Sequence, residues 1–466
     1  MAKVSPMEIY RLLPGTNCKE CGEVTCMAFA SSLIERDKVV EDCKPLEEDK
    51  YREKREKLIE MMTPPVKEIV VGTGEKAFKI GGEEVMYRHE LTFFNQTAFI
   101  VDVHDEMTAG EIAEKVSKAS QFNIERIGQE LTLQGIAVRS KSDDQTKFSD
   151  AVISVTEKTD LPLILCSLNP ELLEVALEIA ADRRPLIYAA TEDNLDNVAE
   201  LALRYKCPVV ASSPGDVQGL IDITSNLMDR GIEDIVLDIG TYPVGEKFGE
   251  MFDNLASLRR LAIEEKVKEV GFPILGVPLV AWLVEKDPVK GGVAEATLAA
   301  SQILRYCDAL IVHSLEMWEI LPLLTLRQNV YTDPRVPISV DSGLYKIGSP
   351  DKNSPVFMTT NFALTYYTVA SDLEASNISC YLLVVDTEGL AVEPAMAGTK
   401  LTASVVKEAL NSSDASSKVK HKSMIIPGMA ARISGELEEE TGWQVKVGPI
   451  DSSRIKAFLE SEVQKN

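Results

Sequence analysis

Four of the eight cysteines of this 466-residue chain fall within a short stretch near its N-terminus. Cys18, Cys21, Cys26 and Cys43 have the spacing C-x2-C-x4-C-x16-C. Close thiols in a long chain with no small disulfide-rich domain are typical of metal binding. Three thiols on one loop and a fourth beyond a helix suit a [4Fe–4S] cluster, because each iron takes one outward thiolate. Zinc is the alternative, although zinc sites usually carry two CxxC pairs and this stretch has one.

The residues around these thiols must position them. Gly22 lets backbone N–H groups turn towards the cluster sulfurs, which raises the reduction potential of such a cluster. Thr25 is predicted to cap a helix over about 27–39, which would separate Cys43 from the loop. The densely charged segment 47–60 is predicted to be a solvated helix or a linker.

The bulk composition excludes several classes of protein. Lys and Arg total 49 against 73 Asp and Glu, and the formal charge of −24 argues against duplex nucleic acid and anionic membrane as partners. The longest apolar stretch, Pro273–Val284, is too short to span a bilayer, and Met1–Pro6 has no apolar signal core. We therefore expect a soluble, cytoplasmic protein. The other four cysteines stand alone in apolar contexts and are predicted to be buried: Cys166, Cys207, Cys307 and Cys380.

From about residue 97, short apolar runs alternate with amphipathic segments, a pattern typical of a parallel sheet. Two short strands, Glu68–Val71 and Val85–Arg88, are expected before it. Eight strands fit a (β/α)8 TIM-like barrel, with an open doubly wound sheet as the alternative. The predicted strands are Ala98–Val103, Gly135–Val138, Leu163–Cys166, Leu186–Ala190, Val209–Ala211, Ile235–Ile239, Ile274–Gly276 and Ala309–His313.

Chemistry in such a barrel belongs at the carboxyl ends of its strands. Asp102 and His104 begin the pattern D-x-H-x-x-G, which supplies a histidine to cobalt in some corrinoid proteins. Met107 stands where the glycine should be, which argues against that role. His313 is expected to be a hydrogen-bonded strand-end residue. The full predicted set of strand-end residues is Asp102, His104, Ser167, Asn169, Thr191, Asp238, Gly240 and His313.

Beyond about residue 325 the pattern predicts a compact αβα, Rossmann-like domain. Ligands in such a domain lie beyond the carboxyl ends of the strands, over helix N-termini. The loops expected there are Thr359–Asn361, Asp386–Gly389 and Gly428–Ala431, which are small, hydroxylated or glycine-bearing. Ordinary turn and capping chemistry explains each loop equally well. The sequence has no G-x-G-x-x-G motif and no P-loop, so NAD and ATP are poor candidates.

Two strings of this last domain carry a resemblance: TTNFALTYY, from Thr359, and PGMAARISGELEEETGW, from Pro427. Together with the cysteine spacing and the barrel, they make the chain resemble the large (gamma) subunit of the corrinoid/iron–sulfur protein of the acetyl-CoA decarbonylase/synthase complex. The resemblance spans essentially the whole chain. It implies three domains: a [4Fe–4S] domain with linker over 1–60, a barrel over 61–325 and a corrinoid-binding αβα domain over 326–466.

The resemblance also implies where a base-off cobamide would bind. The chemistry would be centred on cobalt, so no side chain is expected to be catalytic. Cys18, Cys21, Cys26 and Cys43 would hold the cluster. The implied corrinoid contacts are Thr332, Thr359, Thr360, Asn361, Phe362, Gly389, Gly428, Met429, Ala430 and Ala431.

The implied activity is methyl transfer, as part of a multisubunit methyltransferase. A cob(I)amide/methylcob(III)amide couple would move methyl groups between a methyl-tetrahydropterin and the nickel-iron cluster of acetyl-CoA synthase. The iron–sulfur cluster would re-reduce Co(II) with electrons from a low-potential donor. The implied protein partners are a small (delta) barrel subunit, forming a heterodimer, and the acetyl-CoA synthase subunit. Two other functions stay open: a ferredoxin-like electron donor with a barrel scaffold, and a corrinoid-free pterin-binding methyltransferase.

Overall fold

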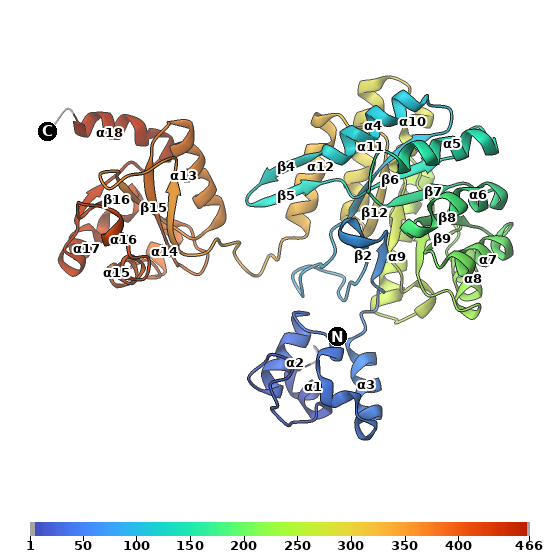
Figure 1. Ribbon diagram of the computed structural model, residues 1–466, viewed down its shortest axis with the longest axis horizontal. Helices are drawn as coiled ribbons and strands as arrows, with labels where there is room; N and C mark the ends of the chain where they lie inside the picture. Colours follow the sequence, from blue (N-terminus) through green and yellow to red (C-terminus); the bar gives the residue numbers. More distant parts are fainter. Residues whose placement is uncertain (1–4, 464–466) are drawn as a thin grey trace. The chain divides into compact units, whose positions relative to one another are not determined.

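The computed structural model describes residues 5–463, so most of the opening stretch Met1–Pro6 lies outside it (Figure 1). The chain separates into two compact units. One runs to Phe122 and resumes over Leu133–Tyr331, and the other holds Asn123–Thr132 and the chain from Thr332 onward. None of the helices within residues 5–463 combines the length and apolar character that crossing a membrane requires.

The first unit begins with a small helical module. Helix α1 (Pro6–Leu12) starts with a capping box at Ser5, α2 (Cys26–Ile34) is capped by Thr25, as predicted, and α3 (Arg52–Met62) closes the module. Short 3-10 turns over Val40–Asp42, Lys44–Glu47 and Asp49–Tyr51 connect α2 to α3. The module has its own apolar core, made of Ile9, Phe29, Leu33, Leu46 and Leu58 among others.

Two features of this module differ from the prediction. Helix α2 ends at Ile34 and not near Val39, because Arg36 takes a left-handed φ of 61°. The N–H of Asp37 then donates to the Ser32 carbonyl at 3.0 Å, a bond that closes the helix end. The charged segment is a helix over its second half and is not a free linker, since Leu58 of α3 is fully buried in the module's core.

A two-stranded hairpin leads from the module to the barrel. Strands β1 (Ile69–Val71) and β2 (Phe78–Ile80) pair antiparallel. The strand predicted over Val85–Arg88 is wrong, because the partner of β1 comes earlier in the chain. Gly81 ends β2 with a φ of 78°, and a side chain there would meet the Lys67 carbonyl oxygen, so only glycine fits.

Eight parallel strands close into a barrel, which confirms that prediction and excludes the open sheet. Their order around the barrel is β10-β11-β12-β3-β6-β7-β8-β9. The chain closes the ring where Ala309 of β12 pairs with Ala98 of β3. The strands are β3 (Ala98–His104), β6 (Gly135–Arg139), β7 (Leu163–Cys166), β8 (Leu186–Ala190), β9 (Val209–Ser212), β10 (Ile235–Asp238), β11 (Ile274–Gly276) and β12 (Cys307–Val312).

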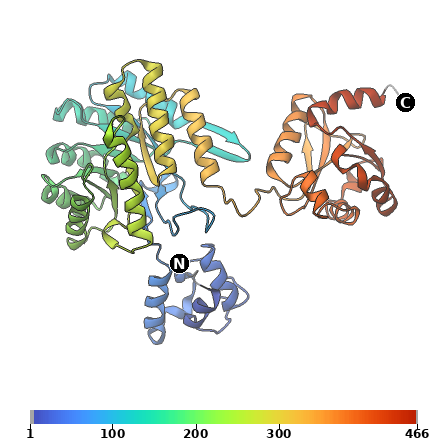
Figure 2. The ribbon, with the colours of Figure 1, turned by 180° about the vertical axis from the view of Figure 1, so that it is seen from behind.

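Helices surround the barrel as an outer layer (Figures 1 and 2), and apolar side chains such as Ile100, Ile164 and Val236 fill its interior. An antiparallel hairpin, β4 (Asn123–Arg126) and β5 (Gln129–Thr132), interrupts the repeat and was not predicted. The helices are α4 (Ala109–Gln121), α5 (Gln145–Thr156), α6 (Pro170–Ala180), α7 (Leu195–Tyr205), α8 (Val217–Asp229), α9 (Glu246–Ile263), α10 (Ala281–Val284), α11 (Pro288–Leu304) and α12 (Met317–Val330).

The second unit contains a five-stranded sheet of order β13-β15-β14-β16-β17. The sheet is mixed, because β13 runs antiparallel to β15 while the other pairs are parallel. The prediction missed β13 and gave four strands; β13 lies at the edge, where its residues are mostly half-buried. The strands are β13 (Gly343–Ile347), β14 (Val356–Thr360), β15 (Cys380–Val385), β16 (Ser423–Ile426) and β17 (Gln444–Val447).

Helices cover both faces of this sheet, and each face has its own apolar core. The loop predicted over Gly428–Ala431 is part of a 3-10 turn over Gly428–Ile433, which leads directly into a helix at Ser434. The chain enters this unit at Thr332, whereas the predicted boundary lay at 325/326. The helices are α13 (Ala363–Ala375), α14 (Val392–Ala397), α15 (Ala403–Ser412), α16 (Ala415–Lys418), α17 (Ser434–Thr441) and α18 (Ile455–Val463).

Candidate functional site

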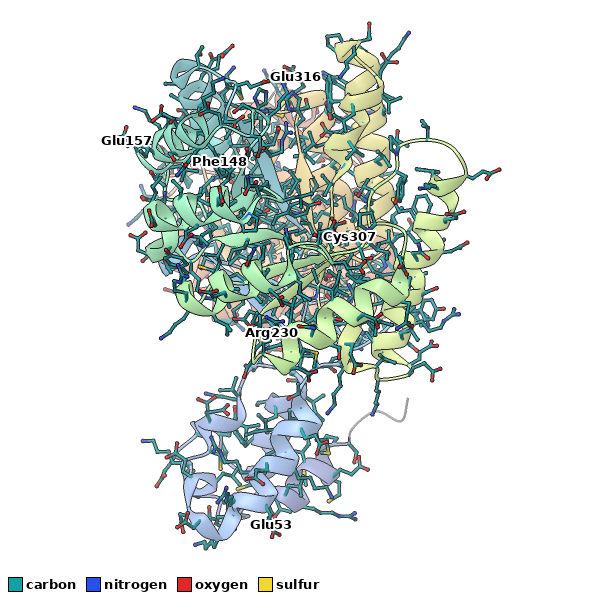
Figure 3. All side chains as sticks on the ribbon, turned by 90° about the vertical axis from the view of Figure 1, so that its right-hand side faces the viewer. Glu53, Phe148, Glu157, Arg230, Cys307 and Glu316 are labelled. Atoms are coloured by element: carbon teal, nitrogen blue, oxygen red, sulfur yellow. The ribbon has the colours of Figure 1, made fainter. Side chains whose placement is uncertain are left out.

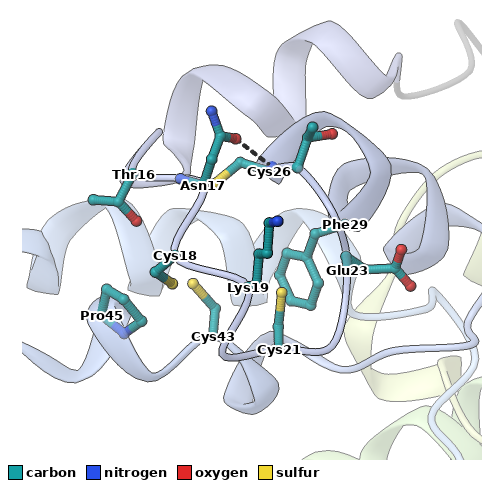
Figure 4. A pocket seen from close by; sticks show the side chains of 11 residues that line it. Thr16, Asn17, Cys18, Lys19, Cys21, Glu23, Cys26, Phe29, Cys43 and Pro45 are labelled. Carbon is teal, nitrogen blue, oxygen red and sulfur yellow. Dashed lines mark hydrogen bonds between the residues drawn. The ribbon is translucent and has the colours of Figure 1, made fainter.

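The side chains of Cys18, Cys21, Cys26 and Cys43 line one small pocket of the N-terminal module (Figure 4). Cys18 and Cys21 lie on the loop before α2, Cys26 is the first residue of that helix, and Cys43 follows the turn Val40–Asp42. The structure therefore brings all four predicted ligands together, although 16 residues lie between Cys26 and Cys43 in the sequence.

The pocket is electrostatically suited to a cation. Burial, together with repulsion from the other three thiols, raises the pKa of Cys43 to about 11, against an opposing hydrogen bond from the N–H of Leu46. Thiolates are the form that binds metal, so four thiols held this close favour a positively charged group that replaces their protons. The chemistry of this donor set fits an iron–sulfur cluster, in which each iron takes one thiolate. Among residues 5–463, the pocket included, no three His, Cys, Asp or Glu side chains converge on one point where a single metal ion would bind.

The other four cysteines are buried, as predicted. Burial raises the pKa of Cys166 to about 12, that of Cys207 to about 11 and that of Cys380 to about 12. The pKa of Cys307 is likewise raised by burial. These thiols stay protonated at neutral pH, so they have neither the exposure nor the thiolate character of reactive cysteines.

A charged network lies at the carboxyl ends of the barrel strands. Asp102, which is fully buried, accepts hydrogen bonds from Lys115 Nζ at 3.0 Å and from Arg139 Nη2 at 2.6 Å. His313 Nδ1 lies 2.7 Å from the same carboxylate, so the expectation of a hydrogen-bonded strand-end residue is confirmed. Burial alone would raise the pKa of Asp102, but Lys115, His313 and Arg139 hold it well below its usual range.

The remaining strand-end residues mostly serve local structure. Asp238 accepts hydrogen bonds from Tyr188, Ser212 and the N–H of Gly240. Burial raises the pKa of Asp238, against these three bonds. The side chain of Asn169 caps α6. These bonds explain the polar side chains at the strand ends as packing and capping.

The C-terminal sheet has a larger cavity at the carboxyl ends of its parallel strands. Its volume is about 440 Å³, within the range of small-molecule and cofactor sites. Side chains from β14, α13, β16, the start of α14 and the loop after β17 line it, and most of them are apolar. The exposed apolar side chains of Leu364, Met429 and Ile450 belong to the same lining. Such an opening suits a flat, largely apolar group.

Two of the predicted corrinoid contacts, Thr359 and Met429, line this cavity. Gly428 lies against the backbone of Gly448 and Ile450, where an added Cβ would come within 2.9 Å of the Gly448 carbonyl oxygen and the Ile450 nitrogen. Ala430 is buried in the core and Ala431 is exposed. The lining does not include Thr332, Thr360, Asn361, Phe362, Gly389, Gly428, Ala430 or Ala431.

Asn361 braces the loop that follows β15. Its Oδ1 accepts hydrogen bonds from the N–H of Thr387, the hydroxyl of Thr387 and the N–H of Gly389, at 3.0, 3.1 and 3.0 Å. Its Nδ2 donates to Asp386 at 3.0 Å. Both ends of the amide are therefore used within the fold. Gly389 joins the same network with a φ of 73°, which a side chain would strain.

Thr359 carries a buried hydroxyl in the lining of the cavity, whereas the buried hydroxyl of Thr360 lies outside that lining. Thr359 Oγ1 and Thr360 Oγ1 have no hydrogen-bond partner among the described residues, although both side chains are almost fully buried. A buried polar atom without a partner costs free energy, so such atoms point to a ligand or water beside them. The residues present at this edge are thus compatible with a large cofactor.

Sequence reasoning missed most of the cavity's lining. Leu364, Thr365 and Thr368 come from one face of α13, whereas Val392 begins α14 and Ile450 lies on the loop after β17. The spacing of Leu364 and Thr368, four residues apart, was the one available signal, because such residues share a helix face. Nothing in the sequence shows that Val392 and Ile450 meet that face.

Three features define the class of this protein: an N-terminal module with a four-thiol pocket, an eight-stranded parallel barrel and a mixed C-terminal sheet. Residues 13–45 match a family described as a putative Fe-S cluster. Residues 68–459 match the family described as CO dehydrogenase/acetyl-CoA synthase delta subunit.

Full-length relatives carry a more particular name. The chain is 48% identical to acetyl-CoA decarbonylase/synthase complex subunit gamma 1 of Methanosarcina thermophila, over 98% of each chain. It is 46% identical to subunit gamma of Archaeoglobus fulgidus, over 98% of each chain, and 44% identical to that of Methanothermobacter thermautotrophicus, over 98% of this chain and 99% of the other. The chain belongs to the family of acetyl-CoA decarbonylase/synthase gamma subunits, the corrinoid/iron–sulfur protein large subunits.

Solved structures resemble about half of the chain. Dihydropteroate synthase from Thermus thermophilus, in complex with 4-aminobenzoate, has a TM-score of 0.37 and 16% identity, covering 51% of this chain and 95% of the other. The enzyme from Stenotrophomonas maltophilia has a TM-score of 0.37 and 16% identity, covering 51% of this chain and 94% of the other. Such low scores and identities carry no information on what this chain binds.

Proposed function

We propose that this chain is the cluster-bearing and corrinoid-binding subunit of a cytoplasmic methyl-transferring complex. The observation that carries the proposal is the four-thiol pocket in a chain that aligns end to end with gamma subunits. In this proposal the three domains keep the predicted order of cluster, barrel and corrinoid, and the last boundary moves from 325/326 to Thr332, where the second unit begins.

Cys18, Cys21, Cys26 and Cys43 hold a [4Fe–4S] cluster in this proposal. The donor set supports it, because four thiolates and four irons match one to one. The apolar core beneath the pocket, including Phe29, excludes water from one side of the site. A low-potential cluster held by these cysteines would supply electrons, taken from an external donor, for the reduction of Co(II) to Co(I); it would serve reactivation and would not be needed in every turnover.

The C-terminal domain holds a base-off cobamide at the carboxyl ends of its strands. Thr359, Met429 and the exposed face of α13 line the apolar cavity, which suits the flat base of the cofactor's nucleotide tail. Asn361 and Gly389 do not line the cavity; they fix the loop after β15. The bound cofactor supplies a cobalt centre that takes up and releases a methyl group; the chain itself positions it and excludes water. Thr332, Thr360, Phe362, Gly428, Ala430 and Ala431 stay proposed contacts.

The proposed protein partners are other subunits of acetyl-CoA decarbonylase/synthase, the complex after which the relatives are named. We propose a heterodimer with the small, delta barrel subunit, and transfer of methyl groups to and from the acetyl-CoA synthase subunit. The other methyl carrier is a methyl-tetrahydropterin, such as tetrahydromethanopterin, tetrahydrosarcinapterin or tetrahydrofolate. We assign its binding to the partner's barrel, since the Asp102 carboxylate of this one is already hydrogen-bonded to Lys115, Arg139 and His313.

Co-expression with the small subunit, followed by counting iron and cobalt in the purified pair, tests the proposal. Four irons and one cobalt per heterodimer, with both corrinoid and iron–sulfur absorbance, are expected. Iron without cobalt, after reconstitution with cobamide, would favour a ferredoxin-like electron donor. Pterin binding without cobalt would favour a corrinoid-free methyltransferase, and either result would overturn the assignment.

A further inference from the structure

A reciprocal pair of hydrogen bonds joins the ligand loop to the first residue of α2. The backbone N–H of Asn17 donates to Cys26 Sγ at 3.4 Å. The backbone N–H of Cys26 in turn donates to Asn17 Oδ1 at 2.8 Å, the bond drawn in Figure 4. Asn17 thus contacts one cysteine with both its backbone and its side chain, and it directly precedes another, Cys18.

The backbone at Asn17 is in an unusual conformation that this side chain stabilises. Its φ of 48° lies in the left-handed region, which asparagine adopts more readily than most residues. The Cys26 N–H is one of the donors at a helix start that lack a partner within the helix. By accepting it, the Asn17 amide satisfies that donor and holds the loop so that the Asn17 N–H faces the sulfur.

An N–H group aimed at a ligand sulfur has a defined effect on a cluster. Reduction adds one electron, and part of the added charge resides on the sulfurs. The hydrogen bond is therefore stronger in the reduced form than in the oxidised form, and it raises the reduction potential. No covalent bond forms or breaks in this step; an external one-electron donor supplies the electron.

We propose that Asn17 is a positioning residue that raises the reduction potential of the cluster by fixing its own N–H on Cys26 Sγ. The inference depends on the proposed cluster and goes beyond it, because it assigns the setting of the potential to one side chain that is not a ligand. Asn17 would thereby bring the cluster within reach of its electron donor while keeping the potential low enough to reduce Co(II).

The decisive variant is Asn17→Gly, in the full chain co-expressed with the small subunit. Glycine adopts the left-handed backbone freely, so only the amide that holds the N–H in place is lost. At the wild-type midpoint potential, the reduced-to-oxidised ratio of the cluster should fall about tenfold, which corresponds to about 59 mV for one electron. A reductive titration followed by electron paramagnetic resonance measures it. Thr63→Ala, at the exposed C-cap of α3 and outside the pocket, should leave the ratio unchanged.

An intact Asn17→Gly cluster with an unchanged midpoint would overturn the inference. If that variant assembles no cluster, Asn17→Asp, which keeps an acceptor oxygen for the Cys26 N–H, should assemble one; failure of both would also overturn it. If even the wild type assembles no cluster, the proposed function itself fails.

The wild-type protein offers an independent measurement. When only asparagine is labelled with ¹⁵N, electron spin echo envelope modulation of the reduced cluster should show one weakly coupled ¹⁵N nucleus. Its presence would support the hydrogen bond from Asn17, and its absence in a fully loaded protein would contradict it.

Discussion

The four-thiol pocket of the N-terminal module and the apolar cavity of the C-terminal sheet are built in opposite ways. The pocket depends on four side chains of one type, all between Cys18 and Cys43. The cavity draws its lining from segments between Phe357 and Ile455, and most of these residues contribute only shape. The comparison teaches that a site made of covalent ligands depends on residue identity, while a site made of shape depends on packing.

The two regions also differ in what supports them. The module is small, so its core is limited and a bound metal group would add much of its stability. The C-terminal sheet has apolar cores on both faces, and buried hydrogen bonds such as those of Asn361 fix its loops. The predictions below test this contrast, from the largest expected effect to the smallest.

Cys26→Ala should abolish the function of the pocket outright. Loss of one of four thiolates should reduce the iron content severely and stop cluster-dependent reduction of Co(II). A corrinoid that has been reduced chemically beforehand should still accept methyl, because the cavity is left intact. Iron analysis, the Co(II) resonance signal and methyl uptake measure the three effects. Cys207→Ala, at a buried cysteine of the barrel, serves as the matched control.

Methyl uptake that disappears together with the cluster in Cys26→Ala would contradict the separation of the two sites. It would mean that the cluster takes part in each turnover.

Thr365→Trp should fill the cavity while leaving the cysteine pocket unaffected. Thr365 is half-buried on α13 and lines the cavity, so an indole there takes the space of the ligand. The affinity for cobamide should fall about 100-fold, or about 2.7 kcal/mol, in an equilibrium titration. Glu374→Trp, at an exposed position on the opposite face of the same helix and outside the lining, should bind normally. Equal affinity in both variants would move the corrinoid site elsewhere.

Asn361→Ala should loosen the C-terminal sheet through hydrogen bonds alone. The substitution leaves Asp386, the N–H and hydroxyl of Thr387 and the N–H of Gly389 without this partner, so local stability should fall by about 2 kcal/mol. Amide hydrogen exchange in β14 and β15 reports it. Thr359→Val, two residues earlier on β14, is the matched variant: its hydroxyl has no partner among the described residues, so the ligand-free domain should be as stable as the wild type or more so. A larger loss of stability in Thr359→Val than in Asn361→Ala would contradict the roles assigned to these two side chains.

Thr25→Ala should have the smallest effect. Thr25 Oγ1 accepts a hydrogen bond from the N–H of Ala28 at 3.1 Å and caps α2. Losing it should cost about 1 kcal/mol in the iron-free module, seen as faster exchange of amides in the first turn of α2. With a cluster in place the cost should shrink, because Cys26 is then held by iron as well. An equal cost in both states would show that the metal contributes little to this helix.

Much of the architecture could be predicted because it follows from local pattern. The eight barrel strands are apolar runs such as Leu163–Cys166, and each lies where the alternation of strands and helices predicts it. The strand predicted over Val85–Arg88 and the missed edge strand β13 show the limit. In both cases a strand forms only where another segment of the chain pairs with it, and the short run of residues does not itself show which segment that is.

The cysteine spacing alone determined which residues form the pocket, because a thiol's chemistry belongs to the residue and a loop of fixed length limits where it can lie. The sequence likewise determined the barrel, through its repeated pattern of apolar runs. Only the tertiary structure decided that Asn361 braces a loop, that α13 contributes Thr365 to a cavity, and that Ile450 lies at the same opening. The reason is physical: cavity shape and hydrogen-bond partners arise from contacts between segments far apart in the chain, and those contacts exist only once it is folded.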